Sequence, residues 1–328
     1  MAAIAGVVFL DVDCEKGDGP KLAEKYNIRG YPTYIMVDPQ GEVTDAWIGY
    51  PGPENWAAFV TAGSKDRRTI PQKKNAYEQE STLALARSLA NHAATSSDYR
   101  ASVEYFNKAR ELDPAGAKDY TQEILYNLYY GSGENIFTAD EIKAEADFVL
   151  AGEGATAEDK VDLAQLITSV AENMNDPEMA VPYIEAGLKA SEGATDENVV
   201  AGRRELEISH ALIAEKDKDK ALRLKRASLD EDWQSDLRTV NSFAYWCFKN
   251  DLNLVESETL VTAGIEQAED DTMRNRFLNT AAEICNATGR TEEAVTHIKR
   301  ILETDPDRGY FQRQLTRFEE ILAESAGQ

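Results

Sequence analysis

The sequence predicts an α/β segment followed by an α-helical repeat region, and three observations support this prediction. Residues 1–64 alternate short apolar, β-branched runs with amphipathic helical stretches. From about residue 81 onward, apolar residues recur at helical spacing, and no convincing strand pattern is present. Small residues also recur there at a spacing that fits repeated pairs of helices. We therefore expect a partial α/β domain at 1–64, a linker at 65–80, and helical repeats with a terminal capping helix at 81–328.

The first segment contains three predicted strands and two predicted helices. Its opening run, Val7-Val-Phe-Leu-Asp-Val-Asp13, is typical of a buried strand because it is short, apolar and β-branched. Each predicted helix has a proline in its first turn, where the missing N–H has no intrahelical acceptor. The predicted strands are residues 7–13, 34–37 and 42–50, and the helices begin at Gly19-Pro20 and Gly52-Pro53.

This order of elements, with Gly30-Tyr31-Pro32-Thr33 before the second strand, resembles the C-terminal half of the thioredoxin fold. Further matches are Asp11-Val-Asp13, residues 21–28, Val37-Asp38, Gly41 and Gly49. The resemblance implies a cis Tyr31–Pro32 bond and a substrate-binding turn formed by Tyr31, Pro32 and Thr33. The backbone of Tyr31 would pair there with an extended substrate chain. The alternative is an ordinary trans turn that joins helix to strand.

The Cys-x-x-Cys pair of the thioredoxin family has no counterpart in this sequence. In that family the pair lies at a helix N-terminus, where the thiol pKa is lowered. Cys14 instead follows the first predicted strand and has no second cysteine nearby, so we interpret it as a non-catalytic thiol. We therefore predict no catalytic residue in this chain.

The resemblance implies a truncated thioredoxin-like segment, since it begins at what would be the third strand of that fold. One hypothesis is that the natural protein carries the missing half upstream and is a thiol–disulfide oxidoreductase. The other is a domain that has decayed into a docking surface. In both cases the sheet would have exposed edges, which favour self-association.

Residues 81–306 resemble tetratricopeptide repeats, which are pairs of helices with small residues where the helices cross. The last unit, residues 278–306, has Ala282 and Ala294 at those positions and ends in Glu303-Thr-Asp-Pro306. The first unit, residues 83–114, is similar and ends in Glu111-Leu-Asp-Pro114. The units between them, at 240–268, 164–192 and 203–229, match less closely. Together they predict a solenoid of tetratricopeptide type, closed by a capping helix at residues 307–324.

Two cysteines fall within these repeats, at equivalent places on the first helices of neighbouring units. We interpret Cys247 and Cys285 as small buried hydrophobic residues.

Residues 65–80 hold a basic cluster in an otherwise acidic chain. The cluster comprises Lys65, Arg67, Arg68, Lys73 and Lys74. The favoured interpretation is a solvated linker. The alternative is a patch that contacts the chain's own acidic surface.

Composition limits the classes of function. The chain has 35 basic and 59 acidic residues and a net charge of −24. Because phosphate groups repel such a surface, we expect neither a nucleic-acid partner nor an anionic membrane partner. The isolated His and Cys residues predict no metal ligand, and no motif predicts a cofactor.

For the chain as given, the sequence favours a protein-binding scaffold without dithiol activity, with a protein or peptide in the repeat groove. The alternative is the C-terminal portion of a thiol–disulfide oxidoreductase, so whether the protein is an enzyme stays open. The compartment stays open as well. A start at Met1 implies the cytoplasm, whereas a signal peptide upstream would imply the periplasm or export.

Overall fold

The computed structural model describes residues 6–14, 16–152 and 154–326. The chain divides into two compact units, residues 1–206 and residues 207–328. The first unit combines a small sheet with helices, and the second is helical in its described residues.

The sheet has two antiparallel strands, β1 (Thr33–Val37) and β2 (Val43–Ile48). Tyr34 lies opposite Trp47, and their rings stack at a centroid distance of 5.3 Å. The turn between the strands includes Gly41 at φ +82°, a conformation that glycine adopts without strain. Both strands lie where the sequence predicted them.

The prediction of a strand at residues 7–13 is wrong, because these residues form neither strand nor helix. Val8 is 95% exposed and Leu10 is 74% exposed. A buried strand needs hydrogen-bonded neighbours, and the described residues of the sheet comprise only β1 and β2. The apolar run pairs with neither of them, so it forms no strand.

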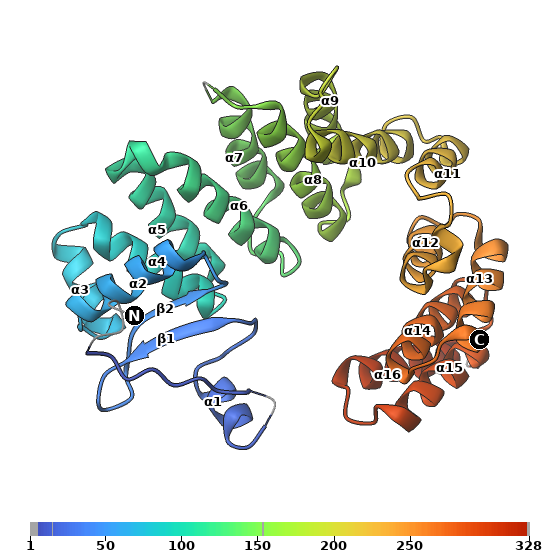
Figure 1. Ribbon diagram of the computed structural model, residues 1–328, viewed down its shortest axis with the longest axis horizontal. Coiled ribbons are helices and arrows are strands. Elements are labelled where there is room, and N and C mark those ends of the chain that lie inside the picture. The colour runs from blue at the N-terminus through green and yellow to red at the C-terminus, as the bar shows by residue number, and fades with distance from the viewer. Residues whose placement is uncertain (1–5, 15, 153, 327–328) are drawn as a thin grey trace. The chain divides into compact units, whose positions relative to one another are not determined.

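Both helices predicted in the first segment are present, as α1 (Gly19–Lys25) and α2 (Pro53–Lys65). Each has a proline at its first or second position, as the sequence indicated. Helix α2 packs on the sheet: Phe59 contacts Trp47, with ring centroids 5.4 Å apart. Figure 1 shows the strands beside α2, α3 and α4.

Most of the segment interpreted as a linker is helical, since α3 spans Ile70–Gln79. Thr69 and Gln72 form a capping box at its N-terminus. Lys73, on this helix, is only 1% exposed. Lys73 therefore departs from the predicted solvated segment, whereas Lys65, Arg67, Arg68 and Lys74 are exposed.

The ammonium group of Lys73 joins α3 to β2 and α4 (Leu83–Thr95). Its Nζ donates to Thr44 O at 2.7 Å and to Ser88 Oγ at 2.9 Å, and it lies 3.4 Å from Asp45 Oδ2. Ser88 Oγ in turn donates to Asp45 Oδ1 at 3.1 Å. A contact between the basic cluster and the chain's own acidic residues therefore holds for Lys73.

From residue 81 on, the described residues form helices and no strand, as predicted. Most of the helices follow one another in antiparallel pairs joined by short turns (Figure 1), which is compatible with a helical repeat region. After α4 they are α5 (Tyr99–Leu112), α6 (Ala117–Ser132), α7 (Ala139–Ala151), α8 (Ala157–Asn173), α9 (Val181–Ala190), α10 (Glu197–Ile213), α11 (Lys218–Ala227), α12 (Leu237–Lys249), α13 (Leu254–Gln267), α14 (Asp271–Ala287), α15 (Thr291–Thr304) and α16 (Gly309–Ala326), with short 3-10 turns at Pro114–Gly116, Pro177–Ala180 and Trp233–Ser235.

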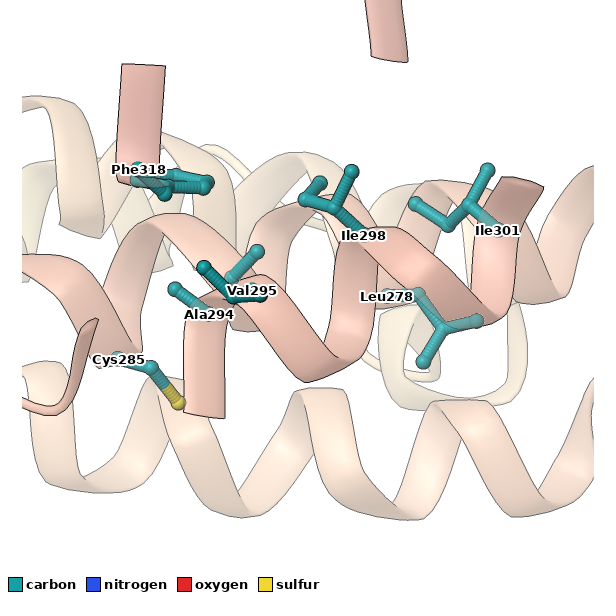
Figure 2. Packing of buried hydrophobic residues seen from close by; sticks show 8 residues of the cluster. Leu278, Cys285, Ala294, Val295, Ile298, Ile301 and Phe318 are labelled. Carbon is teal, nitrogen blue, oxygen red and sulfur yellow. The ribbon is translucent and has the colours of Figure 1, made fainter. Parts of the chain in front are cut away.

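The small residues predicted at the helix crossings are buried. Ala282 on α14 and Ala294 on α15 have no exposed surface, and Ile298 and Ile301 pack beside them. Figure 2 shows Ala294, Ile298 and Ile301 together with Phe318 of α16. Helix α16 thus covers the last hairpin with an apolar face, and it lies where the capping helix was predicted.

The first helical pair packs in the same way. Ser102 on α5 has no exposed surface, and its Oγ donates to Ala90 O on α4 at 3.0 Å. This bond satisfies the buried hydroxyl without widening the gap between the helices. Ala109 continues the same contact stripe.

Candidate functional site

A cleft of about 520 Å³ opens between α5 and α7, and α6 forms its floor. Its walls carry paired charges and its floor is apolar. A hollow with an apolar floor and a few polar groups at its sides is the usual form of a binding site.

One wall of the cleft is a stripe of α5. The lining residues are spaced at three and four positions, so they share one face of the helix. The opposite face of α5 is buried against α4, which leaves this stripe turned to the cleft. The stripe consists of Arg100, Val103, Glu104, Asn107 and Arg110.

The facing wall is a stripe of α7, formed by Glu141, Ala144, Glu145 and Phe148. Thr138 sets the start of this helix through a capping box: its backbone N–H donates to Glu141 Oε2 at 2.8 Å. Hydrogen bonds from Arg100 and Thr138 lower the pKa of Glu141 to about 2, so this carboxylate is charged at neutral pH.

Two arginine–glutamate pairs cross the cleft. Arg100 Nη1 lies 2.8 Å from Glu141 Oε1, and Arg110 Nη2 donates to Glu145 Oε2 at 3.0 Å. Arg110 also donates to Thr121 Oγ1 at 3.0 Å. Each ion pair links α5 to α7 at one point along the cleft, so together the two pairs set its width.

The floor is apolar, with Ile124 and Leu128 of α6 both buried and Phe137 beside them. The guanidinium of Arg100 lies 4.9 Å from the centre of the Phe137 ring. The guanidinium of Arg110 lies 4.4 Å from the Phe148 ring. These contacts hold both guanidinium groups against aromatic rings of the cleft lining.

Glu104 is the exception among the charged lining residues, because it has no ion-pair partner among the residues that the structure describes. It is exposed at the rim. Two arginines face three glutamates in the lining, so the cleft carries one uncompensated negative charge. It is therefore suited to an apolar group that has a cation beside it.

The residues predicted to bind substrate lie elsewhere, in the turn before β1. The Tyr31–Pro32 bond is cis, as the resemblance implied. Tyr31 is 64% exposed, Thr33 Oγ1 donates to Gly30 O at 2.6 Å, and Gly49 N–H donates to Pro32 O at 2.8 Å. None of the three lines the cleft. Their predicted role in substrate binding stays a prediction.

Sequence reasoning did not identify the cleft residues. The sequence feature that could have indicated one of them is Thr138-Ala-Asp-Glu141, a capping-box pattern that marks the start of α7. The pairs of Arg100 with Glu141 and Arg110 with Glu145 join residues 41 and 35 positions apart, respectively. Helical periodicity within one segment cannot predict such pairings.

The three cysteines are free. Cys247 and Cys285 are buried, as predicted, and burial raises the pKa of both thiols. Since the thiolate is the reactive form, burial makes both residues poor nucleophiles. Cys14 is half-buried and precedes α1.

Among the residues that the structure describes, no three His, Cys, Asp or Glu side chains gather as a group able to hold a metal ion. No helix in this part of the chain combines the length and apolarity that a membrane crossing requires. Comparisons with known protein families and with curated proteins find no match.

Proposed function

We propose that this chain is a protein-binding scaffold of helical repeats and that the cleft between α5 and α7 holds a peptide segment. The segment carries one apolar side chain with a basic residue beside it. The cleft itself carries the proposal: an apolar floor between two ion-paired walls, with Glu104 uncompensated at the rim.

The interactions that favour such a segment divide between floor and rim. An apolar side chain placed over Ile124 and Leu128 loses its contact with water, which stabilises binding by about 1.5–3 kcal/mol for a leucine-sized group. A lysine or arginine near Glu104 adds a solvated ion pair of about 0.2–1 kcal/mol. The net charge of −24 also speeds the approach of a basic partner at low salt.

The resemblance of residues 81–306 to tetratricopeptide repeats supports the same class of function, because arrays of helical pairs present extended surfaces to peptides. The buried small residues at the crossings of the first and last pairs agree with that resemblance. A thioredoxin-like role for residues 1–64 is not part of the proposal, since the described cysteines offer no dithiol.

Fluorescence anisotropy with two labelled decapeptides tests the proposal. One peptide carries a leucine flanked by two lysines, and the other has glutamates in place of the lysines. We expect the basic peptide to bind several-fold more tightly than the acidic one. Ala144→Trp fills the cleft from an exposed position and abolishes binding, whereas Ala151→Trp, exposed on the same helix but outside the lining, leaves it unchanged.

The contribution of the rim is tested with Glu104→Gln. We expect this variant to weaken binding of the basic peptide about two- to fivefold, as the loss of one solvated ion pair implies. Glu111→Gln, on the same helix but outside the cleft, is the matched control. Equal binding of the two peptides, or unchanged binding by Ala144→Trp, would show that the cleft is not the site.

A further inference from the structure

The outer edge of β1 carries unused hydrogen-bonding groups. Gly49 N–H donates to Pro32 O at 2.8 Å, and Asp38 N–H donates to Glu42 O at 2.9 Å. Both ends of β1 therefore direct the polar groups of even-numbered residues toward β2. Because these groups alternate in direction along an antiparallel strand, Thr33, Ile35 and Val37 direct theirs away from β2.

No backbone hydrogen bond reaches those outward groups from any described residue outside the strand pair. Open strand edges are normally blocked by charged side chains, by proline or by a covering segment. The five residues Thr33-Tyr-Ile-Met-Val37 contain no charge and no proline. Neither charge nor proline within the strand therefore blocks this edge.

Exposed apolar side chains accompany this edge. Phe9 and Tyr34 both contact the Trp56 ring, at centroid distances of 6.4 and 6.1 Å, which places the segment around Phe9 near β1. Val8, Leu10 and Phe9 itself are all exposed. Tyr31 and Val37, which lie at opposite ends of β1, are exposed as well, so apolar side chains flank the unpaired backbone groups.

We propose that the open edge of β1 pairs antiparallel with the same edge of a second copy of this chain. A two-fold axis at Ile35 would place Thr33 of one copy opposite Val37 of the other, so all outward groups find partners. The charges flanking the strand favour this occupant: Arg29 precedes one end and Asp38 follows the other. Antiparallel self-pairing brings these ends of opposite charge together.

The proposal does not depend on the cleft between α5 and α7, and sedimentation velocity from about 1 µM to about 300 µM tests it. We expect the weight-average mass to rise from 36.4 kDa toward twice that value. Each copy carries a charge of −24, and salt screens the repulsion between the two copies. The association constant of the dimer should therefore rise several-fold between about 0.05 M and about 0.5 M salt.

Ile35→Pro is the discriminating variant. Its ring removes an outward N–H and blocks a neighbouring strand, yet no β1–β2 hydrogen bond uses that group. We expect a monomer at every concentration, whereas Ile35→Ala, which keeps the N–H, still dimerises. Val37→Lys, at an exposed position, gives a second monomeric variant should Ile35→Pro fail to fold. A wild-type chain that stays monomeric, or a dimer unaffected by both monomer-forming variants, would overturn the proposal.

Discussion

Replacing Lys73 by methionine should release the sheet from the first helical pair. The ammonium group is buried and makes hydrogen bonds to Thr44 O, Ser88 Oγ and the Asp45 carboxylate. Methionine preserves the length of the side chain and removes all three bonds. Asp45 would then be left as a buried carboxylate without its cation.

The expected loss of stability is about 3–5 kcal/mol, as found when one partner of a buried ion pair is removed. Burial raises the pKa of Asp45 while Lys73 opposes that rise. Because its folded pKa lies above its unfolded value, Asp45 binds a proton more readily in the folded state. The loss in Lys73→Met should therefore be greatest at neutral pH and should shrink as the pH falls through the pKa of Asp45.

Hydrogen exchange measured by mass spectrometry locates the effect. In Lys73→Met, exchange at residues 43–48 should accelerate roughly 10²- to 10⁴-fold, since each 1.4 kcal/mol corresponds to about a tenfold change. Lys74→Met, at the neighbouring exposed position, should change little. Lys73→Met with Asp45→Leu should recover part of the loss because both charges are gone. An acceleration below about tenfold, or no recovery in the double variant, would refute the reasoning.

Three further predictions concern the helical region. The pKa of Glu141 is about 2, below its ordinary value of 4.5, so its contribution to the unfolding free energy is complete above pH 4.5 and is lost as the pH falls toward 2. In Glu141→Gln, the unfolding free energy measured in urea should therefore depend less on pH in that range. Gly264→Ala should lower the free energy of unfolding by about 1–3 kcal/mol, since the added Cβ would lie 2.3 Å from the Phe277 ring. In Gly133→Ala the added Cβ meets no atom within 4 Å, so thermal melts should show little change for this variant. Cys285 should react slowly with a thiol reagent in the folded chain and quickly in urea, because burial raises its pKa, and equal rates would contradict this.

Local patterns predicted much of the fold. Prolines in the first helical turn located α1 and α2, a short apolar run located β1, and alternation of apolar and polar residues located β2. Small residues such as Ala282 marked the helix crossings. These signals are legible because each depends on residues close together in the sequence. The division at 65–80 stays a prediction, although Lys73 joins residues on both sides of that segment.

What the sequence did not reveal depends on partners distant in the chain. Residues 7–13 have strand composition, but strand formation requires a hydrogen-bonded neighbour, and composition does not show whether one is present. Lys73 is indistinguishable in sequence from the exposed Lys74 until Asp45 and Ser88 are placed around it. The cleft likewise exists only because α5 and α7 are brought to face each other.

The central claim, that a basic peptide occupies the cleft, is tested most directly by hydrogen exchange with and without the lysine-flanked decapeptide. The account predicts slower exchange at residues 100–110 and 141–148 when the peptide is present. It predicts no change at residues 240–301, which belong to the other unit. Protection confined to residues 240–301, or to the turn at Tyr31–Thr33, would contradict the claim.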